Sequence, residues 1–77
     1  MKEFIEYVVK QLVDKPDDVR VTEVRGNSVT VYELHVGEGD MGKVIGKKGQ
    51  TAFAIRKLLS AATAKKKGTR SILEILE

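Results

Sequence analysis

Glycine is concentrated in one part of this 77-residue chain: five of its seven glycines lie between Gly37 and Gly49. Because glycine adopts backbone conformations that other residues avoid, such a stretch interrupts regular structure instead of continuing one helix or strand. The sequence before it is rich in β-branched residues, and the sequence after it repeats apolar residues at helical spacing. The chain is therefore expected to fold as an α+β domain in which glycine-rich turns join strands to helices.

Six elements are expected along the chain, in the order α-β-β-α-α-β. They are helices at 2–14, 41–45 and 50–66, and strands at 19–25, 29–36 and 71–76. Pro16 ends the first helix, and a tight turn at 26–28 joins the first two strands. The expected architecture is a three-stranded sheet with three helices on one face, forming a single domain over residues 1–77.

Two finer expectations concern packing. The first strand breaks its alternation of apolar and polar residues between Val21 and Val24, which predicts a bulge or twist there. The long helix is expected to face the core with Ile55, Leu58, Leu59 and Ala62.

The excess of positive over negative charge is confined to one segment. The net charge of the whole chain is only +3, yet residues 41–67 contain eight basic residues and no Asp or Glu. These basic residues are Lys43, Lys47, Lys48, Arg56, Lys57, Lys65, Lys66 and Lys67. A segment of this kind is the electrostatic footprint expected of a site for a polyanion. The Lys65–Lys67 run also suits a helix C-terminus, so it is expected to be secondary to the loop.

The sequence Gly46-Lys47-Lys48-Gly49 lies immediately before the long helix. A phosphate near this loop would meet backbone N–H groups, the positive end of a helix dipole and two ammonium groups. The plain alternative is a turn between two helices with solvated lysines. Two overlapping motifs fit poorly: the G-x-G-x-x-G at 37–42 contains two acids that would repel a pyrophosphate, and the P-loop-like run at 42–48 has the wrong spacing.

The sequence Gly42-Lys43-Val44-Ile45-Gly46-Lys47-Lys48-Gly49-Gln50-Thr51, followed by Ala54-Ile55-Arg56, resembles the signature of KH domains. It is most similar to the bacterial KhpA family of short, single-KH proteins. The resemblance covers nearly the whole chain and implies the second KH topology. It also implies a groove with the two helices around the loop as one wall and a β-strand as the other, which holds about four unpaired nucleotides.

The resemblance implies particular roles within this groove. Gly46 and Gly49 allow close approach of the RNA backbone, Lys47 and Lys48 meet phosphate, and Ile45 lies on an apolar floor. The full set of implied RNA-binding residues is Gly42, Lys43, Ile45, Gly46, Lys47, Lys48, Gly49, Gln50, Thr51 and Arg56. The implied partners are single-stranded RNA and a second KH protein, either another copy of this chain or a larger KH-containing RNA-binding protein. The implied role is that of an RNA chaperone or post-transcriptional regulator.

One face of the long helix, opposite its predicted core stripe, carries an aromatic residue among small ones. Its residues are Phe53, Lys57, Ser60, Ala61 and Ala64. Three interpretations stay open for Phe53: an isolated exposed apolar residue, an anchor for a dimer or a partner KH protein, and a platform on which a base stacks.

Other classes of function are disfavoured. The chain has no cysteine and one histidine, His35, so neither a metal site nor a nucleophile–base pair is expected, and no cofactor and no enzymatic activity are predicted. No apolar run approaches the roughly 18 residues of a membrane span, and a cytoplasmic location is expected. The alternative function is a protein-interaction module whose basic face docks an acidic partner.

Overall fold

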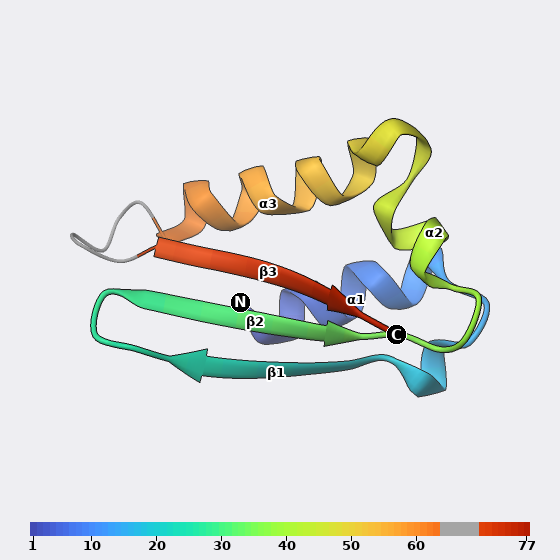
Figure 1. Ribbon diagram of the computed structural model, residues 1–77, viewed down its shortest axis with the longest axis horizontal. Helices are drawn as coiled ribbons and strands as arrows, with labels where there is room; N and C mark the ends of the chain where they lie inside the picture. The colour runs from blue at the N-terminus through green and yellow to red at the C-terminus, as the bar shows by residue number, and fades with distance from the viewer. Residues whose placement is uncertain (64–69) are drawn as a thin grey trace.

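The structure is a computed structural model that describes residues 1–63 and 70–77 (Figure 1). Its helices are α1 (Lys2–Leu12), α2 (Met41–Ile45) and α3 (Gln50–Thr63), and its strands are β1 (Arg20–Arg25), β2 (Val29–His35) and β3 (Arg70–Leu76). The predicted order α-β-β-α-α-β is confirmed. The predicted continuation of the last helix to residue 66, with its lysines and Gly68, lies outside the described residues.

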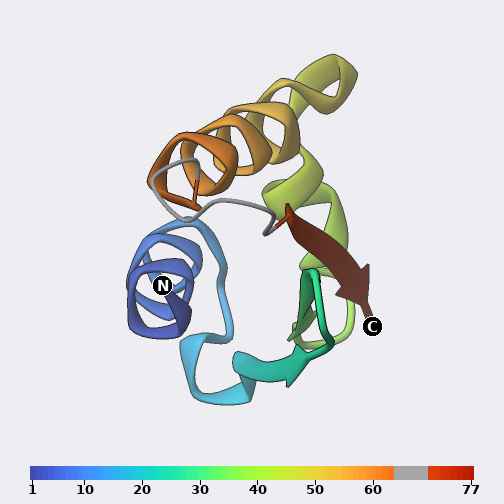
Figure 2. The same ribbon diagram turned by 90° about the vertical axis from the view of Figure 1, so that its left-hand side faces the viewer.

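The three strands form one mixed sheet in the order β1-β2-β3 (Figure 1). β1 and β2 pair antiparallel through a tight turn, in which Gly26 N donates to Val29 O at 2.6 Å. β2 and β3 pair parallel, so the chain has to cross from one end of the sheet to the other between them. That crossover consists of α2 and α3, and α1 and α3 cover the same side of the sheet (Figure 2).

The core lies between these helices and the inner face of the sheet. β2 sends Tyr32 and Leu34 inward, and Leu34 pairs in register with Val21 on β1 and Ile75 on β3. The helices bring Ile5 and Val9 from α1, Val44 from α2, and Ile55 and Leu59 from α3. The apolar positions of α1 are three and four residues apart, which is why a single stripe of this helix is buried.

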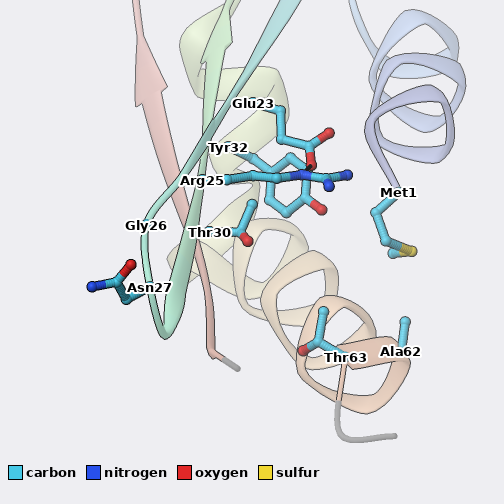
Figure 3. A pocket seen from close by; sticks show the side chains of 9 residues that line it. All are labelled: Met1, Glu23, Arg25, Gly26, Asn27, Thr30, Tyr32, Ala62 and Thr63. Carbon is cyan, nitrogen blue, oxygen red and sulfur yellow. Dashed lines mark hydrogen bonds and ion pairs between the residues drawn. The ribbon is translucent and has the colours of Figure 1, made fainter. Parts of the chain in front are cut away.

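A bulge or twist was predicted between Val21 and Val24, and the prediction of a bulge is wrong. The register of β1 with β2 runs without a break from the Arg20–His35 pair to the Arg25–Thr30 pair. The alternation continues because Glu23 takes the inward position, and Val24 faces outward with 49% of its surface exposed. The inward position can hold the charged Glu23 because this carboxylate forms an ion pair with Arg25, close to the β1–β2 turn (Figure 3).

The predicted core stripe of α3 is half wrong. Ile55 and Leu59 are buried as expected, but Leu58 is 52% exposed and Ala62 is also exposed. Ala52, which was not predicted to be in the core, is buried instead. The buried stripe of α3 is narrower than predicted, and the helix packs mainly against β3 and α2.

A buried carboxylate fastens the end of α1 to the start of α2. Asp40 is 2% exposed and accepts hydrogen bonds from the backbone N–H of Asp14 at 3.3 Å and of Lys15 at 2.9 Å. These donors lie just after the last turn of α1, whereas Asp40 directly precedes α2. Asp40 therefore fixes the position from which the glycine-rich segment leaves the core.

Replacing Asp40 with Asn is expected to lower the free energy of unfolding by about 1–3 kcal/mol, because one of two buried acceptor oxygens becomes a donor that faces an N–H group. Urea denaturation measures this change. The matched control is Asp14→Asn, which alters an exposed carboxylate paired with Lys43 and should cost under about 1 kcal/mol. Equal effects of the two variants would contradict the role given to Asp40.

Candidate nucleic-acid interface

The loop of interest is a short turn between two helices. α2 ends at Ile45, where Gly46 N donates to Gly42 O at 2.9 Å, and α3 begins at Gln50. Between them Lys47–Gly49 forms one 3-10 turn, closed by a bond from Gly49 N to Gly46 O at 3.1 Å. The turn leaves both lysine side chains exposed at the N-terminal end of a 14-residue helix.

Gly46 is required by sterics at its position. Its φ of 78° lies in the region that side chains rarely adopt, and a Cβ there would be only 2.7 Å from the Cβ of Thr51. Thr51 is half-buried against this glycine in the first turn of α3. The pair therefore holds the end of α2 close to the start of α3, which is a structural role for Thr51 besides the RNA contact predicted for it.

Lys48 is in a left-handed conformation, with φ 56° and ψ 25°. It is the one non-glycine residue of the described chain with positive φ. Such a conformation costs a side-chain-bearing residue on the order of 1–3 kcal/mol, and strain of this kind clusters at functional sites. A glycine would fit the same turn at less cost, so the lysine at this position points to a function for its charge.

The loop lysines differ from Lys43 in their electrostatic surroundings. Lys43 Nζ lies 3.2 Å from a carboxylate oxygen of Asp14 and 3.9 Å from one of Asp40, so its charge is largely compensated within the protein. Lys47 and Lys48 form no ion pair within residues 1–63 and 70–77. Of the three lysines in the predicted RNA-binding set, Lys47 and Lys48 are the ones whose charge is available to a ligand.

The remaining predicted RNA-binding residues surround the loop. Ile45 closes α2 with 37% of its surface exposed, and Gln50 opens α3 as an exposed side chain. Arg56 lies farther along α3 and donates from Nη2 to the backbone oxygen of Leu73 on β3 at 3.3 Å. The structure therefore brings one of the predicted RNA-binding side chains, that of Arg56, into a hydrogen bond with β3.

The second predicted surface is the outward face of α3. Phe53 is 59% exposed, and Lys57 Nζ lies 5.0 Å from the centroid of its ring, a cation–π contact worth about 0.5–1 kcal/mol at an exposed site. Ser60 and Ala61 are exposed on the same helix, as predicted, whereas Ala64 lies outside the described residues. A large apolar side chain thus remains uncovered on this face.

A cavity of about 300 Å³ lies beside the β1–β2 turn (Figure 3), at the end of the molecule away from the connection between α2 and α3 (Figure 1). It is bordered by the β1–β2 turn, the start of α1 and the end of α3, and its polar centre is the Glu23–Arg25 pair beside Tyr32. The hydrogen bond from Arg25 lowers the pKa of the Glu23 carboxyl, and burial raises the pKa of Tyr32. Glu23 and Arg25 were not among the predicted site residues, because no motif in the sequence indicates that two charged strand residues line a cavity.

The remaining predictions concern His35, metal sites and membrane-spanning helices. His35 lies on the outer face of β2 and pairs in register with Arg20. Among the described residues no three His, Cys, Asp or Glu side chains come together as a metal site would require. In the same part of the chain, no helix has the length and apolar character needed to cross a membrane.

Comparison with known proteins supplies independent information. Residues 2–75 match the family model described as KhpA/KhpB, KH domain. A protein of Chlamydia trachomatis named RNA-binding protein KhpA is 51% identical over 77 residues, covering all of this chain and 97% of its own. Proteins of the same name from Clostridium perfringens and Aquifex aeolicus are 50% and 48% identical, covering 99% and 100% of this chain and 100% and 96% of their own. No solved structure matched the chain.

Replacing Gly46 with Ala is expected to destabilise the fold by about 1–3 kcal/mol, because the new methyl group both strains the backbone and collides with Thr51. Gly42→Ala is the matched control: it adds the same group in α2, where nothing lies within 4 Å, and helix propensity predicts a gain of up to about 1 kcal/mol. Both values come from urea denaturation. A neutral Gly46→Ala would contradict the geometry described for the loop.

Proposed function

This chain belongs to the KhpA/KhpB family of KH domains, and from that membership we propose that it binds single-stranded RNA through the loop Gly46–Gly49. The observation that carries the proposal is the pair of exposed lysines, Lys47 and Lys48, that no carboxylate among the described residues compensates. Relatives about half identical over their full length are named RNA-binding proteins. That name and the loop geometry support the same chemistry.

The loop offers three kinds of attraction to one phosphate group. The first backbone N–H groups of α3 have no partner within their own helix, although Gln50 N donates to Lys47 O of the preceding turn. The dipole of a 14-residue helix also places partial positive charge at this end. Lys47 and Lys48 add two formal charges. Gly46 and Gly49 carry no side chain, so a nucleic-acid backbone can approach the peptide groups closely.

The groove predicted next to the loop would favour unpaired nucleotides. Its predicted floor includes Ile45, an exposed apolar side chain that suits the face of a base rather than a phosphate. Single-stranded bases are free to stack there and to present their edges to the protein, whereas the bases of an A-form duplex are closed off. A footprint of about four nucleotides is consistent with the space that KH domains offer.

The double variant Lys47→Asp/Lys48→Asp is expected to lose nearly all affinity for single-stranded RNA, because two acids replace the cations at the phosphate position. Fluorescence anisotropy with a labelled ten-nucleotide RNA measures the affinity, and circular dichroism verifies the fold. Lys2→Asp/Lys10→Asp is the control with an equal change of net charge on α1, and it should bind within about threefold of wild type.

A salt series on the same titrations identifies the contacts. Two or three phosphate contacts predict a log–log slope of roughly −1.5 to −2 for the wild type, at about −0.7 per phosphate. Unchanged affinity in a folded Lys47→Asp/Lys48→Asp variant would refute the proposal. If neither single-stranded RNA nor a duplex binds, while an acidic protein does, the alternative function of docking an acidic protein partner takes its place.

A footprint of about four nucleotides gives limited specificity, so a second binding module would raise overall affinity through effective concentration. The proposed partner is another copy of this chain or a larger KH-containing RNA-binding protein, and the proposed role is that of an RNA chaperone or post-transcriptional regulator. The family's description, which joins KhpA and KhpB, supports a partner of the same kind. The cytoplasmic location stays a prediction.

The surface proposed for this partner is the outward face of α3. Phe53 exposes 59% of its surface there, and the exposed Ser60 and Ala61 have small side chains, so another helix could come close. Leu58, which is 52% exposed, lies on a different side of the same helix, about 140° from Phe53 at 3.6 residues per turn. The two residues are equally apolar and similarly exposed, which makes them a matched pair for a test.

Phe53→Asp is expected to dissociate a self-associated form, because burial of one Phe contributes about 1.5–3 kcal/mol per copy. Leu58→Asp should leave the association unchanged. Sedimentation equilibrium on the wild type and both variants gives the result, and the thermal melt of each variant reports the fold. A wild type that stays monomeric at high concentration, or a dimer sensitive to Leu58 and not to Phe53, would speak against this face.

A further inference from the structure

Arg56 connects the two walls of the proposed groove. It projects from α3, and its Nη2 donates to the backbone oxygen of Leu73 at 3.3 Å. Leu73 lies in the middle of β3, which pairs with β2 on one side and has no strand on its other side among the described residues. The arginine therefore reaches across from the helix to the free edge of the sheet.

The directions of the backbone groups on β3 show that the Leu73 oxygen, which accepts this bond, lies on the free edge of the sheet. Arg70 N donates to Ser28 O, and Leu76 O accepts from Val36 N, so these two residues direct their backbone groups toward β2. Backbone groups alternate between the two edges of a strand, and the odd-numbered residues of β3 therefore face the free edge. The bond from Arg56 to Leu73 O agrees with this alternation. Arg56 thus occupies the central acceptor of the edge that a base would meet.

Guanidinium groups discriminate between bases because they have donors and no acceptor. Guanine and uracil present a carbonyl oxygen on the edge where adenine and cytosine present an amino group. A keto base can accept from the remaining N–H groups of Arg56 while Leu73 O stays occupied. At that position an amino base places its own donor against the donors of Arg56, and the Leu73 oxygen that could accept from it already holds one hydrogen bond from Arg56.

We propose that Arg56 is a specificity-determining residue, which makes the groove prefer uracil and guanine over cytosine and adenine by masking Leu73 O and presenting donors in its place. This inference rests on the proposed RNA binding. It assigns to Arg56 a role that differs from that of Lys47 and Lys48, whose point charges attract any phosphate regardless of the base. Removing the guanidinium has two effects at once, since it deletes the donors and exposes the carbonyl.

Single-stranded U10 and C10 are suited to the test, because the two bases differ at position 4 by a carbonyl against an amino group. The wild type is expected to bind U10 roughly tenfold more tightly than C10, within the range of one well-placed pair of hydrogen bonds. In Arg56→Met the affinity for U10 should fall, the affinity for C10 should hold or rise, and the U10-to-C10 ratio should drop to one or below. Arg56→Lys keeps the charge without the planar fork, and its ratio should lie between those of the wild type and Arg56→Met.

The control is Lys57→Met, which removes one positive charge from the next position of α3, where the side chain lies over Phe53. It should lower both affinities by one common factor and keep the ratio. If Arg56→Met behaves like Lys57→Met, Arg56 acts on phosphate alone and the specificity proposal is overturned while RNA binding stands. A wild type that binds neither RNA overturns both proposals. Should Arg56→Met fail to fold, an unchanged ratio in Arg56→Lys is sufficient to reject the inference.

Discussion

The parallel pairing of β2 with β3 is the constraint on which the arrangement of this molecule depends. Parallel strands cannot be joined by a tight turn, so the chain has to return over the helix side of the sheet before β3 begins. The 14 residues of α3 span about 21 Å as a helix, close to the roughly 23 Å of the seven residues of β3. One helix therefore runs the full return, and the break between α2 and α3 falls beyond the end of the sheet. The loop is exposed because the crossover leaves it there.

The position of each lysine in the fold decides whether a carboxylate compensates its charge. Lys43 is in the same basic segment as Lys47 and Lys48, yet its neighbours Asp14 and Asp40 come from the end of α1 and the start of α2 and compensate it. Asp40 at the same time accepts backbone hydrogen bonds in the core, so one buried carboxylate both secures the base of the glycine-rich segment and removes Lys43 from the free charge. The uncompensated positive charge is concentrated at the turn itself, where Lys47 and Lys48 have exposed side chains.

The sequence was sufficient to predict the order and type of the elements, since each is marked by its own periodicity or by glycine and proline. It was less informative about which residues are buried. Leu58 and Ala62 share the apolar character of Ile55 and Leu59, yet they stay exposed, and no local pattern distinguishes the two pairs. Glu23 was unpredictable for a related reason: an acid facing inward is tolerated because Arg25 is two residues away on the same side of the strand. The contacts of Asp40 and Arg56 join residues 17 or more positions apart, and no local pattern indicates such pairs.

Different sides of α3 contact the core, β3 and the surroundings of the protein. Ala52, Ile55 and Leu59 are buried in the core, and Arg56 donates a hydrogen bond to β3. Phe53 lies about 60° around the helix from Arg56 at 3.6 residues per turn, so the proposed partner surface borders the proposed groove without entering it. In a dimer formed through that surface, the grooves of the two copies would lie beside the same interface. A single strand of RNA leaving one groove would then find the second at high effective concentration, which is the condition under which two short footprints act as one longer site.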